Sequence, residues 1–308
     1  MKVLLTGASG FLGKNFLKFS PKEMQIIGLY NKSDDIEKFV KENNLKNVAL
    51  CKCDLTSRKE IDKAIKRIGS EFDYCVYLAG NVDVSLSIRD PMEDMNMNAV
   101  AVVNFLSSIK RIGKFVYMST AGVYDGNKGK VSVKTSLHPT IPYCISKLAC
   151  ERYVEFFKNA GTIDNYVIIR FSGAFGPYSK GSKFIAKAVE DIGIKNKGKT
   201  EIYGDGKNKI NIMYSRDLVD ALAVCLKSRK GNITVNLGQN DMTIIGAVEK
   251  IAKILGKKVS IKTSPRRKDQ KYIHFEYDSD FNEAFGFKPK YSFEAGIREF
   301  AHFLQKEK

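Results

Sequence analysis

The chain has 308 residues, of which 44% are hydrophobic and 11% aromatic, and its formal net charge is +17 at pH 7. This length accommodates a main domain and a smaller lobe, and no apolar run approaches the ~20 residues that a membrane-spanning helix needs. Lysine and arginine are spread along the whole chain, so we interpret the charge as solvated surface and expect no nucleic-acid partner.

The cysteines and histidines give no sign of a metal centre. Six cysteines stand at positions 51, 53, 75, 144, 150 and 225, none of them in a C-x-x-C pair, and there are three histidines. Nothing near the N-terminus resembles a signal peptide, because the first apolar run is short and leads into glycines. We therefore expect a cytoplasmic protein with reduced thiols, no bound metal and no membrane segment.

The first 15 residues carry the clearest motif. An apolar run at 1–5 is followed by closely spaced glycines, and a helical pattern starts at Lys14. Glycines between a strand and a helix let backbone amides approach a diphosphate, which the helix dipole also attracts. An ordinary glycine-rich turn is the alternative. We interpret the segment as a dinucleotide site and assign to it Gly7, Ser9, Gly10, Phe11, Leu12 and Gly13.

Further strands alternate with helical patterns as far as residue 172. We expect strands at 24–31, 48–53, 74–78, 115–119 and 166–171, and helices at 57–68, about 92–110 and from 142 onward. This alternation indicates an α/β fold with a doubly wound parallel Rossmann sheet. We assign residues 1–172 to a dinucleotide-binding domain, to which 211–237 return, and residues 173–210 and 238–308 to a smaller C-terminal α/β substrate lobe.

Polar and small residues follow the predicted strands, where such a fold binds its cofactor. The second strand ends in Asn31-Lys32, although NAD-binding proteins commonly place a carboxylate there to bind the adenosine ribose. The missing carboxylate and the adjacent cation favour NADP over NAD. Asp54, after the third strand, has two interpretations, a cap for the next helix or a contact to the adenine amino group. Ala79-Gly80, after the fourth strand, lets a cofactor lie against the backbone.

Tyr143 and Lys147 form a candidate catalytic pair. The chain holds three Tyr-x-x-x-Lys pairs, but the other two enclose turn sequences, whereas Pro142 suits the first turn of a helix. On a helix the two side chains share one face. A cation beside a phenol lowers the pKa of the phenol from about 10 toward working pH, which suits a general base or acid. The alternative is an ordinary surface pair.

Together these segments resemble the extended short-chain dehydrogenase/reductase family, in its nucleotide-sugar epimerase/dehydratase branch. The resemblance runs nearly end to end. It rests on the glycine motif and the Tyr143–Lys147 pair, and on the segments Asp54-Leu55, Tyr77-Leu78-Ala79-Gly80, Phe115 to Tyr124, Tyr203-Gly204-Asp205-Gly206 and Gly286-Phe287-Lys288-Pro289.

The resemblance implies site residues and their roles. Tyr143 exchanges the proton of a sugar hydroxyl, Lys147 holds the nicotinamide ribose, and Thr120 hydrogen-bonds the reacting oxygen while hydride passes between sugar and nicotinamide. We add Leu55, Leu78 and Asn98 to the expected cofactor contacts. The expected substrate contacts are Ser85, Thr120, Gly173, Lys183 and Arg266.

The sequence departs from the family pattern at three places. Ala121-Gly122 stand where many dehydratases carry an Asp-Glu pair, so we do not expect dehydration. Gly173 stands where an Asn is common, and Ile210 where a phosphate-binding Arg is common, so the usual grip on a nucleotide diphosphate is weakened.

We therefore expect an NAD(P)-dependent nucleotide-sugar epimerase that acts by transient hydride transfer, most simply at C4. Two alternatives stay open, an NADPH-dependent 4-keto-sugar reductase and a non-catalytic dinucleotide-binding sensor or scaffold. The apolar faces of the helices at 92–110 and 143–158 predict a homodimer with a four-helix interface, or equally a face covered within the monomer.

Overall fold

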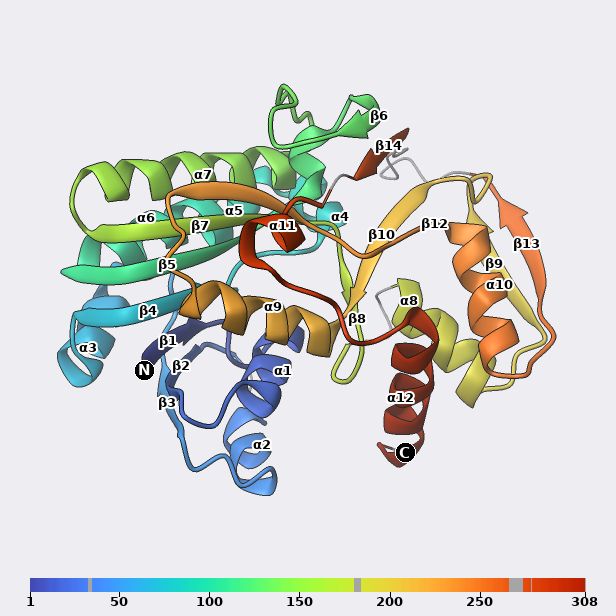
Figure 1. Ribbon diagram of the computed structural model, residues 1–308, viewed down its shortest axis with the longest axis horizontal. Coiled ribbons are helices and arrows are strands. Elements are labelled where there is room, and N and C mark those ends of the chain that lie inside the picture. The colour runs from blue at the N-terminus through green and yellow to red at the C-terminus, as the bar shows by residue number, and fades with distance from the viewer. Residues whose placement is uncertain (33–34, 180–183, 266–273, 278, 308) are drawn as a thin grey trace.

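A computed structural model describes residues 1–307 apart from 33–34, 180–183, 266–273 and 278. Its largest feature is a parallel sheet of seven strands in the order β11-β7-β5-β4-β1-β2-β3 (Figure 1). The strands are β1 (Lys2–Thr6), β2 (Gln25–Tyr30), β3 (Val48–Lys52), β4 (Glu71–Tyr77), β5 (Arg111–Thr120), β7 (Ile163–Phe171) and β11 (Ile233–Leu237). The predicted doubly wound α/β fold is confirmed.

The strand order reverses direction at β1, because β1 pairs with β2 on one side and β4 on the other. In open parallel sheets, ligands bind beyond the carboxyl ends of the strands at such a reversal. The glycine motif follows β1 directly and the segment Leu78-Ala79-Gly80 follows β4, so the topology brings these two predicted cofactor segments together.

Helices cover both faces of this sheet. Alternate side chains of β1 point to opposite faces: Val3 and Leu5 belong to one buried cluster and Leu4 to the other. The first cluster is completed by α1 (Phe11–Phe19), α2 (Ile36–Glu42), α9 (Ser215–Lys227) and α11 (Phe281–Phe285). The second cluster is completed by α3 (Arg58–Ile68), α6 (Ala101–Ser108) and α7 (Pro142–Asn159).

The helix expected at 92–110 is made of three consecutive pieces. They are α5 (Pro91–Met95), a π-helical turn η1 (Asn96–Val100) and α6, and they follow the short helix α4 (Val84–Arg89). A π turn shifts the side chains after it around the helix axis. Asp94, in α5, and Asn98, in the π turn, are both buried, and both elements pack against α7.

A second group of elements lies beside the seven-stranded sheet, at the right of Figure 1. A separate buried cluster holds it together, with Phe175, Tyr214 and Phe300 among its largest side chains. Its elements are β8 (Ala174–Phe175), α8 (Phe184–Val189), η3 (Glu190–Ile194), β9 (Lys199–Tyr203), β10 (Lys209–Tyr214), β12 (Asn240–Thr243), α10 (Ile244–Ile254), β13 (Ser260–Ser264) and α12 (Phe293–Lys306). The division of the chain into two domains at the boundaries given above stays a prediction.

A small parallel pair of strands, β6 (Lys128–Val131) and β14 (His274–Tyr277), lies at the top of Figure 1. It follows the 3₁₀ turn η2 (Ala121–Tyr124), which leads out of β5. Lys209 of β10 forms an ion pair with Glu276 of β14 at 2.6 Å, which ties this pair of strands to the second group of elements.

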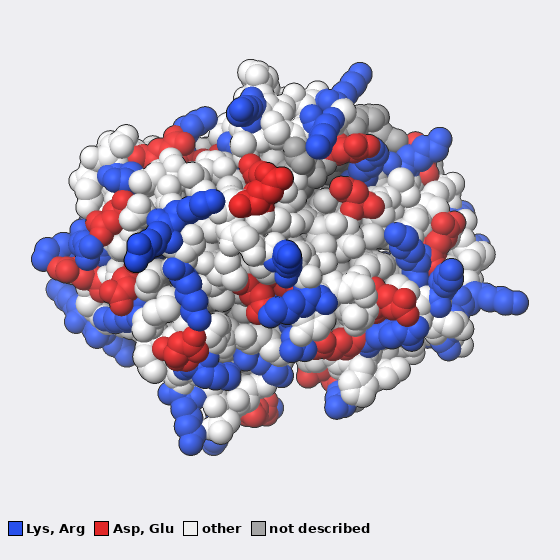
Figure 2. Space-filling model, viewed as in Figure 1, with Lys and Arg blue, Asp and Glu red and all other residues white. Residues whose placement is uncertain are grey.

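The surface carries dispersed charge and one concentration of apolar side chains. In Figure 2, Lys and Arg are scattered among Asp and Glu over the visible face. Five exposed apolar side chains lie on α5, η1 and α7, which pack against one another, and we call them the α5–α7 surface: Met92, Val100, Ile145, Tyr153 and Phe156. None of the helices in the described part of the chain has the length and hydropathy to cross a bilayer.

Candidate active site

A cavity of about 850 Å³ opens at the carboxyl edge of the sheet. Its walls come from the loop between β1 and α1, from the ends of β2 to β5 and β7, and from the first turn of α7. Its far end is closed by the turn between η2 and β6 and by β10. The cavity therefore joins the strand ends of the sheet to the second group of elements.

The glycine loop can take its path only because positions 7 and 13 have no side chain. Gly7 has φ +69°, and a β-carbon there would lie 2.9 Å from the backbone nitrogen of Ala79. A β-carbon at Gly13 would lie 2.2 Å from the carbonyl oxygen of Gly7. Thr6 Oγ1 accepts hydrogen bonds from the backbone nitrogens of Leu78 and Ala79, both at 3.1 Å, and so fixes the distance between the two loops.

The first turn of α1 begins beyond Gly10 and lines the cavity. Its free backbone N–H groups and the positive end of its dipole make this wall suited to a diphosphate. This local structure fits the pyrophosphate of a dinucleotide.

The ends of β2 and β3 form the adenosine side of the cavity, with Asn31, Lys32 and Asp54 in its wall. Asp54 does not cap α3, because Ser57 does so by accepting a hydrogen bond from the Glu60 nitrogen. Burial raises the pKa of Asp54, but hydrogen bonds from Thr56 and Asn31 and the charge of Lys32 outweigh it and hold that pKa below its ordinary value. An ionised carboxylate therefore stands beside Lys32.

Thr120, the last residue of β5, and Tyr143, in the first turn of α7, meet in the cavity wall. Burial is the largest influence on the phenol and raises its pKa, while a hydrogen bond with Thr120 lowers it and the net shift is upward. The expectation of a lowered pKa is therefore wrong in this structure. Desolvation of the charged phenolate is the physical reason.

Lys147 is buried and lies behind the cavity wall, with Nζ 4.3 Å from the centroid of the Tyr117 ring. Burial lowers the pKa of this ammonium group, while the charges of Cys150, Glu151 and Asp94 raise it. Lys147 thus lies beneath the cavity wall, one helical turn after Tyr143.

Most of the predicted site residues line the one cavity. They are Gly7, Ser9, Gly10, Phe11, Leu12, Gly13, Asn31, Lys32, Asp54, Leu55, Leu78, Ala79, Gly80, Thr120, Tyr143 and Gly173. Lys147, Asn98 and Ser85 are not among its lining residues: Asn98 is buried behind Gly80, and Ser85 lies in α4 next to the lining residue Val84. Lys183 and Arg266 lie outside the described residues. The roles assigned to all these residues stay predictions.

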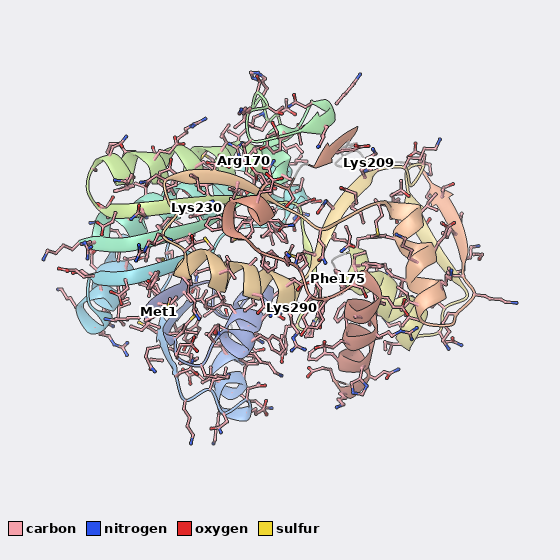
Figure 3. All side chains as sticks on the ribbon, in the orientation of Figure 1. Met1, Arg170, Phe175, Lys209, Lys230 and Lys290 are labelled. Carbon is pink, nitrogen blue, oxygen red and sulfur yellow. The ribbon has the colours of Figure 1, made fainter. Side chains whose placement is uncertain are left out.

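Polar side chains at the far end of the cavity went unnoticed in the sequence. Lys209, whose position is marked in Figure 3, lines this end and is paired with Glu276. The Asp-Gly-Asn sequence after Tyr124 indicates a turn, but nothing in it shows that the turn closes over the strand ends. The newly found polar lining residues are Asp125, Asn127, Lys128, Lys209, Asn211 and Asp241.

A buried ion pair fastens α7 to the sheet beneath this site. Arg170 of β7 donates to Glu151 of α7 from Nη2 at 2.8 Å and from Nε at 3.2 Å, and Ser119 donates to the same carboxylate. Arg170, labelled in Figure 3, also donates to the Tyr124 hydroxyl at 2.9 Å. Ser119 is next to Thr120 on β5, and Glu151 is on the same helix as Tyr143. The network therefore fixes β5, which carries Thr120, relative to α7, which carries Tyr143.

The position two residues after Thr120 has little room for a side chain. A β-carbon at Gly122 would lie 2.5 Å from Cys144 Sγ, and the Gly122 nitrogen donates to Thr120 Oγ1 at 3.0 Å. This part of the cavity thus offers the hydroxyl groups of Thr120 and Tyr143 and the thiol of Cys144, with Ala121 and Gly122 directly after Thr120. Proton transfer by hydroxyl groups is the chemistry that this arrangement supports.

The chain is similar to known proteins along most of its length. An uncharacterised UDP-glucose epimerase of Bacillus subtilis is 28% identical over 86% of both chains. The dTDP-D-glucose 4,6-dehydratase of Homo sapiens is 24% identical over 97% of this chain and 88% of its own. The UDP-glucuronic acid 4-epimerase of Bacillus cereus, solved with UDP-glucuronic acid and NAD, has the same fold (TM-score 0.87, 20% identity, all of both chains). Residues 3–238 match the sequence model of the NAD dependent epimerase/dehydratase family, and the chain therefore belongs to that family.

Proposed function

We propose that this protein is a nucleotide-sugar 4-epimerase that uses a tightly held dinucleotide. The observation that carries the proposal is the hydrogen-bonded pair of Thr120 and Tyr143 in the wall of the cavity that the glycine loop also lines. A protein that only binds a dinucleotide has no need of two hydroxyl groups at the point where a sugar hydroxyl reacts.

The chain's own residues account for binding and proton transfer. The first turn of α1 would hold the diphosphate, and the ends of β2 and β3 the adenosine. Tyr143 takes the proton of the C4 hydroxyl while Thr120 donates a hydrogen bond to the same oxygen, and Lys147 stabilises the phenolate from behind. When bound, the dinucleotide supplies reversible hydride acceptance. After the sugar has rotated to present its other face, Tyr143 returns the proton to the C4 oxygen and the epimeric hydroxyl is formed.

We propose NAD as the resident cofactor. Lys32 favours the 2′-phosphate of NADP, but the ionised Asp54 stands beside it and accepts a hydrogen bond from Asn31. A carboxylate at this place repels a second phosphate and accepts hydrogen bonds from ribose or adenine. Mass spectrometry of the small molecules released from denatured protein distinguishes the two, because NADP in place of NAD would overturn this choice.

Epimerisation agrees better with the site than dehydration does. Elimination of water needs an acid and a base beside the sugar, in addition to the groups that act at C4. Ala121 carries no such group, and a side chain at Gly122 would meet Cys144. The site therefore retains the C4 chemistry of the family without the elimination step.

We further propose that the protein is a homodimer and works in the cytoplasm. The α5–α7 surface presents five exposed apolar side chains on adjacent helices, with Phe156 58% and Met92 68% exposed. Packing this surface against a second copy would remove it from water and form a four-helix interface. All six cysteines are buried and unpaired, as is usual for a reducing compartment.

The test is the interconversion of UDP-glucose with UDP-galactose, and of UDP-glucuronic acid with its C4 epimer, followed by proton NMR with NAD-loaded protein. We expect epimer to form without net NADH, and Tyr143→Phe to lower the rate at least about a hundredfold while it still binds NAD. The exposed Tyr203 supplies the control Tyr203→Phe, which should keep full activity. A Tyr143→Phe variant within a few-fold of the native rate would overturn the proposal.

A further inference from the structure

Asp94 is a completely buried carboxylate that no sequence motif identifies. It lies in α5 with none of its surface exposed, and its two oxygens accept three hydrogen bonds. Asn81 Nδ2 donates to Oδ1 at 2.7 Å and Asn98 Nδ2 to the same oxygen at 3.0 Å. Ser146 Oγ donates to Oδ2 at 2.7 Å. Asp94 thus joins the loop after β4, the turn η1 and helix α7.

Two of these partners lie against the cofactor side of the cavity. Asn81 also holds its own loop, accepting from the Asp83 nitrogen at 2.8 Å and donating to the Asp83 carbonyl at 3.0 Å. Asn98 Oδ1 is buried without a hydrogen-bond partner and lies close to Gly80, where a β-carbon would be 2.4 Å away. Since Gly80 lines the cavity, Asp94 fixes one of its walls.

The third partner lies inside the catalytic helix. Ser146 stands between Tyr143 and Lys147, and its Oγ is also 3.0 Å from the Tyr143 carbonyl oxygen. A hydroxyl group has one proton to donate, and an ionised carboxylate is the stronger acceptor, so the bond to Asp94 takes it. The first turn of α7 is therefore anchored to α5 at the residue next to the catalytic lysine.

The charge of Asp94 reaches both catalytic side chains. Burial is the largest influence on both groups, and it raises the pKa of Tyr143 and lowers the pKa of Lys147. The charge of Asp94 raises both pKa values. The other ionisable groups that act on Lys147 are Cys150 and Glu151, both on α7. Those that act on Tyr143 are Cys144 and Cys150, and the Thr120 hydroxyl is hydrogen-bonded to the phenol.

We propose that Asp94 is a positioning residue for the reaction, whose buried carboxylate holds the loop after β4 and the first turns of α7 at a fixed spacing around the nicotinamide end of the cavity. The inference rests on the proposed function of the Thr120–Tyr143 site. Asp94 touches neither the substrate nor the cofactor directly: it acts through Asn81, Asn98 and Ser146.

Asp94→Asn tests the charge while it keeps the hydrogen bonds. The new amide oxygen accepts from Asn81 and Asn98, its NH₂ donates to Ser146 Oγ, and Ser146 turns to the Tyr143 carbonyl. Without the negative charge the pKa values of Tyr143 and Lys147 both fall. Since the activity depends on the ionisation of these two groups, both limbs of the pH profile of kcat/KM should move about half a unit to lower pH. Asp90→Asn, an exposed carboxylate that caps the same helix, is the matched control and should leave both limbs in place.

Asp94→Ala tests the link itself, because it removes the one carboxylate that all three donors share. We expect the Kd for NAD, measured by calorimetry without substrate, to rise at least about tenfold, while Asp94→Asn changes it less than threefold. If Asp94→Ala does not fold, Ser146→Ala removes the α7 end of the link: kcat should fall about tenfold with the sugar-nucleotide KM within twofold.

The outcomes separate this inference from the proposed function. If Tyr143→Phe is inactive and the limbs of Asp94→Asn stay where they are, or NAD binds Asp94→Ala as tightly as the native protein, the inference about Asp94 is wrong and the function stands. If Tyr143→Phe keeps its activity, the function fails whatever the Asp94 variants do.

Discussion

The β-carbon that Gly13 lacks would lie 2.2 Å from the carbonyl oxygen of Gly7 and 2.6 Å from that of Ala8. Helix α1 therefore packs onto the loop that precedes it at a distance that only glycine permits. The loop in turn meets Ala79 beyond β4, so that one close contact sets the shape of the diphosphate end of the cavity.

Gly13→Ala should therefore push α1 away from the loop. We expect the affinity for NAD to fall at least about tenfold and the free energy of unfolding to fall by about 2 kcal/mol, because the obstructing atoms belong to the backbone and cannot rotate away. Calorimetric titration and urea unfolding measure the two effects. Gly198→Ala is the control, since no atom lies within 4 Å of a β-carbon there. Native affinity in Gly13→Ala would contradict the account.

Removal of one charge from the Glu151–Arg170 pair should destabilise the fold. Both side chains are almost completely buried, so Glu151→Gln leaves a guanidinium group without its counter-charge. We expect the free energy of unfolding to fall by about 3 kcal/mol in a urea titration. The exposed pair of Glu71 and Lys110 supplies the control, Glu71→Gln, which should leave stability unchanged. Equal effects of the two substitutions would refute this reading of the buried network.

Much of the site follows from the sequence, because strand ends and glycines are local signals. Strand β1 and its glycine loop are adjacent in the chain, and parallel strands bring Thr120 and Gly80 to the same edge. Pro142 also predicted that Tyr143 lies in the first turn of a helix, as it does in the structure. What a local pattern determines was predicted well.

What depends on packing could not be read in the same way. Lys147 shares a helical face with Tyr143, but whether that face meets the cavity or the sheet depends on the depth at which α7 packs. The pKa of the Tyr143 phenol was expected to fall because Lys147 lies one helical turn away. The burial that raises this pKa cannot be read from the sequence. Asp94 was overlooked since its three partners are 13, 4 and 52 residues away along the chain.

The buried tyrosines predict a late tyrosine titration. Burial raises the pKa of Tyr77 and Tyr117 well above their ordinary value in the folded protein. Their contribution to stability is complete below about pH 10, the pKa of an unfolded tyrosine, and is lost as the pH rises further. Tyrosinate absorbance should therefore reach its final value only as the near-ultraviolet circular dichroism is lost. A complete tyrosinate signal in protein with a native spectrum would show that these phenols are not buried.

The α5–α7 surface predicts an association that one charge disrupts. Phe156→Glu places a carboxylate at its exposed edge, so a dimer held by this surface should dissociate into monomers in sedimentation velocity at micromolar concentration. Tyr203→Glu, at another exposed aromatic position, on β9, should leave the dimer intact. Native protein that sediments as a monomer would show that there is no dimer, and a Phe156→Glu dimer would place the interface elsewhere.

The central claim is that hydride leaves and returns to the same sugar carbon. UDP-glucose labelled with deuterium at C4, incubated with NAD-loaded protein and followed by NMR, tests it most directly. The account predicts UDP-galactose that retains the deuterium at C4, with no net formation of NADH. Solvent hydrogen at C4 would contradict the transfer of hydride to and from the same carbon. Product that appears only as NADPH is consumed would also contradict it, and would favour a 4-keto-sugar reductase.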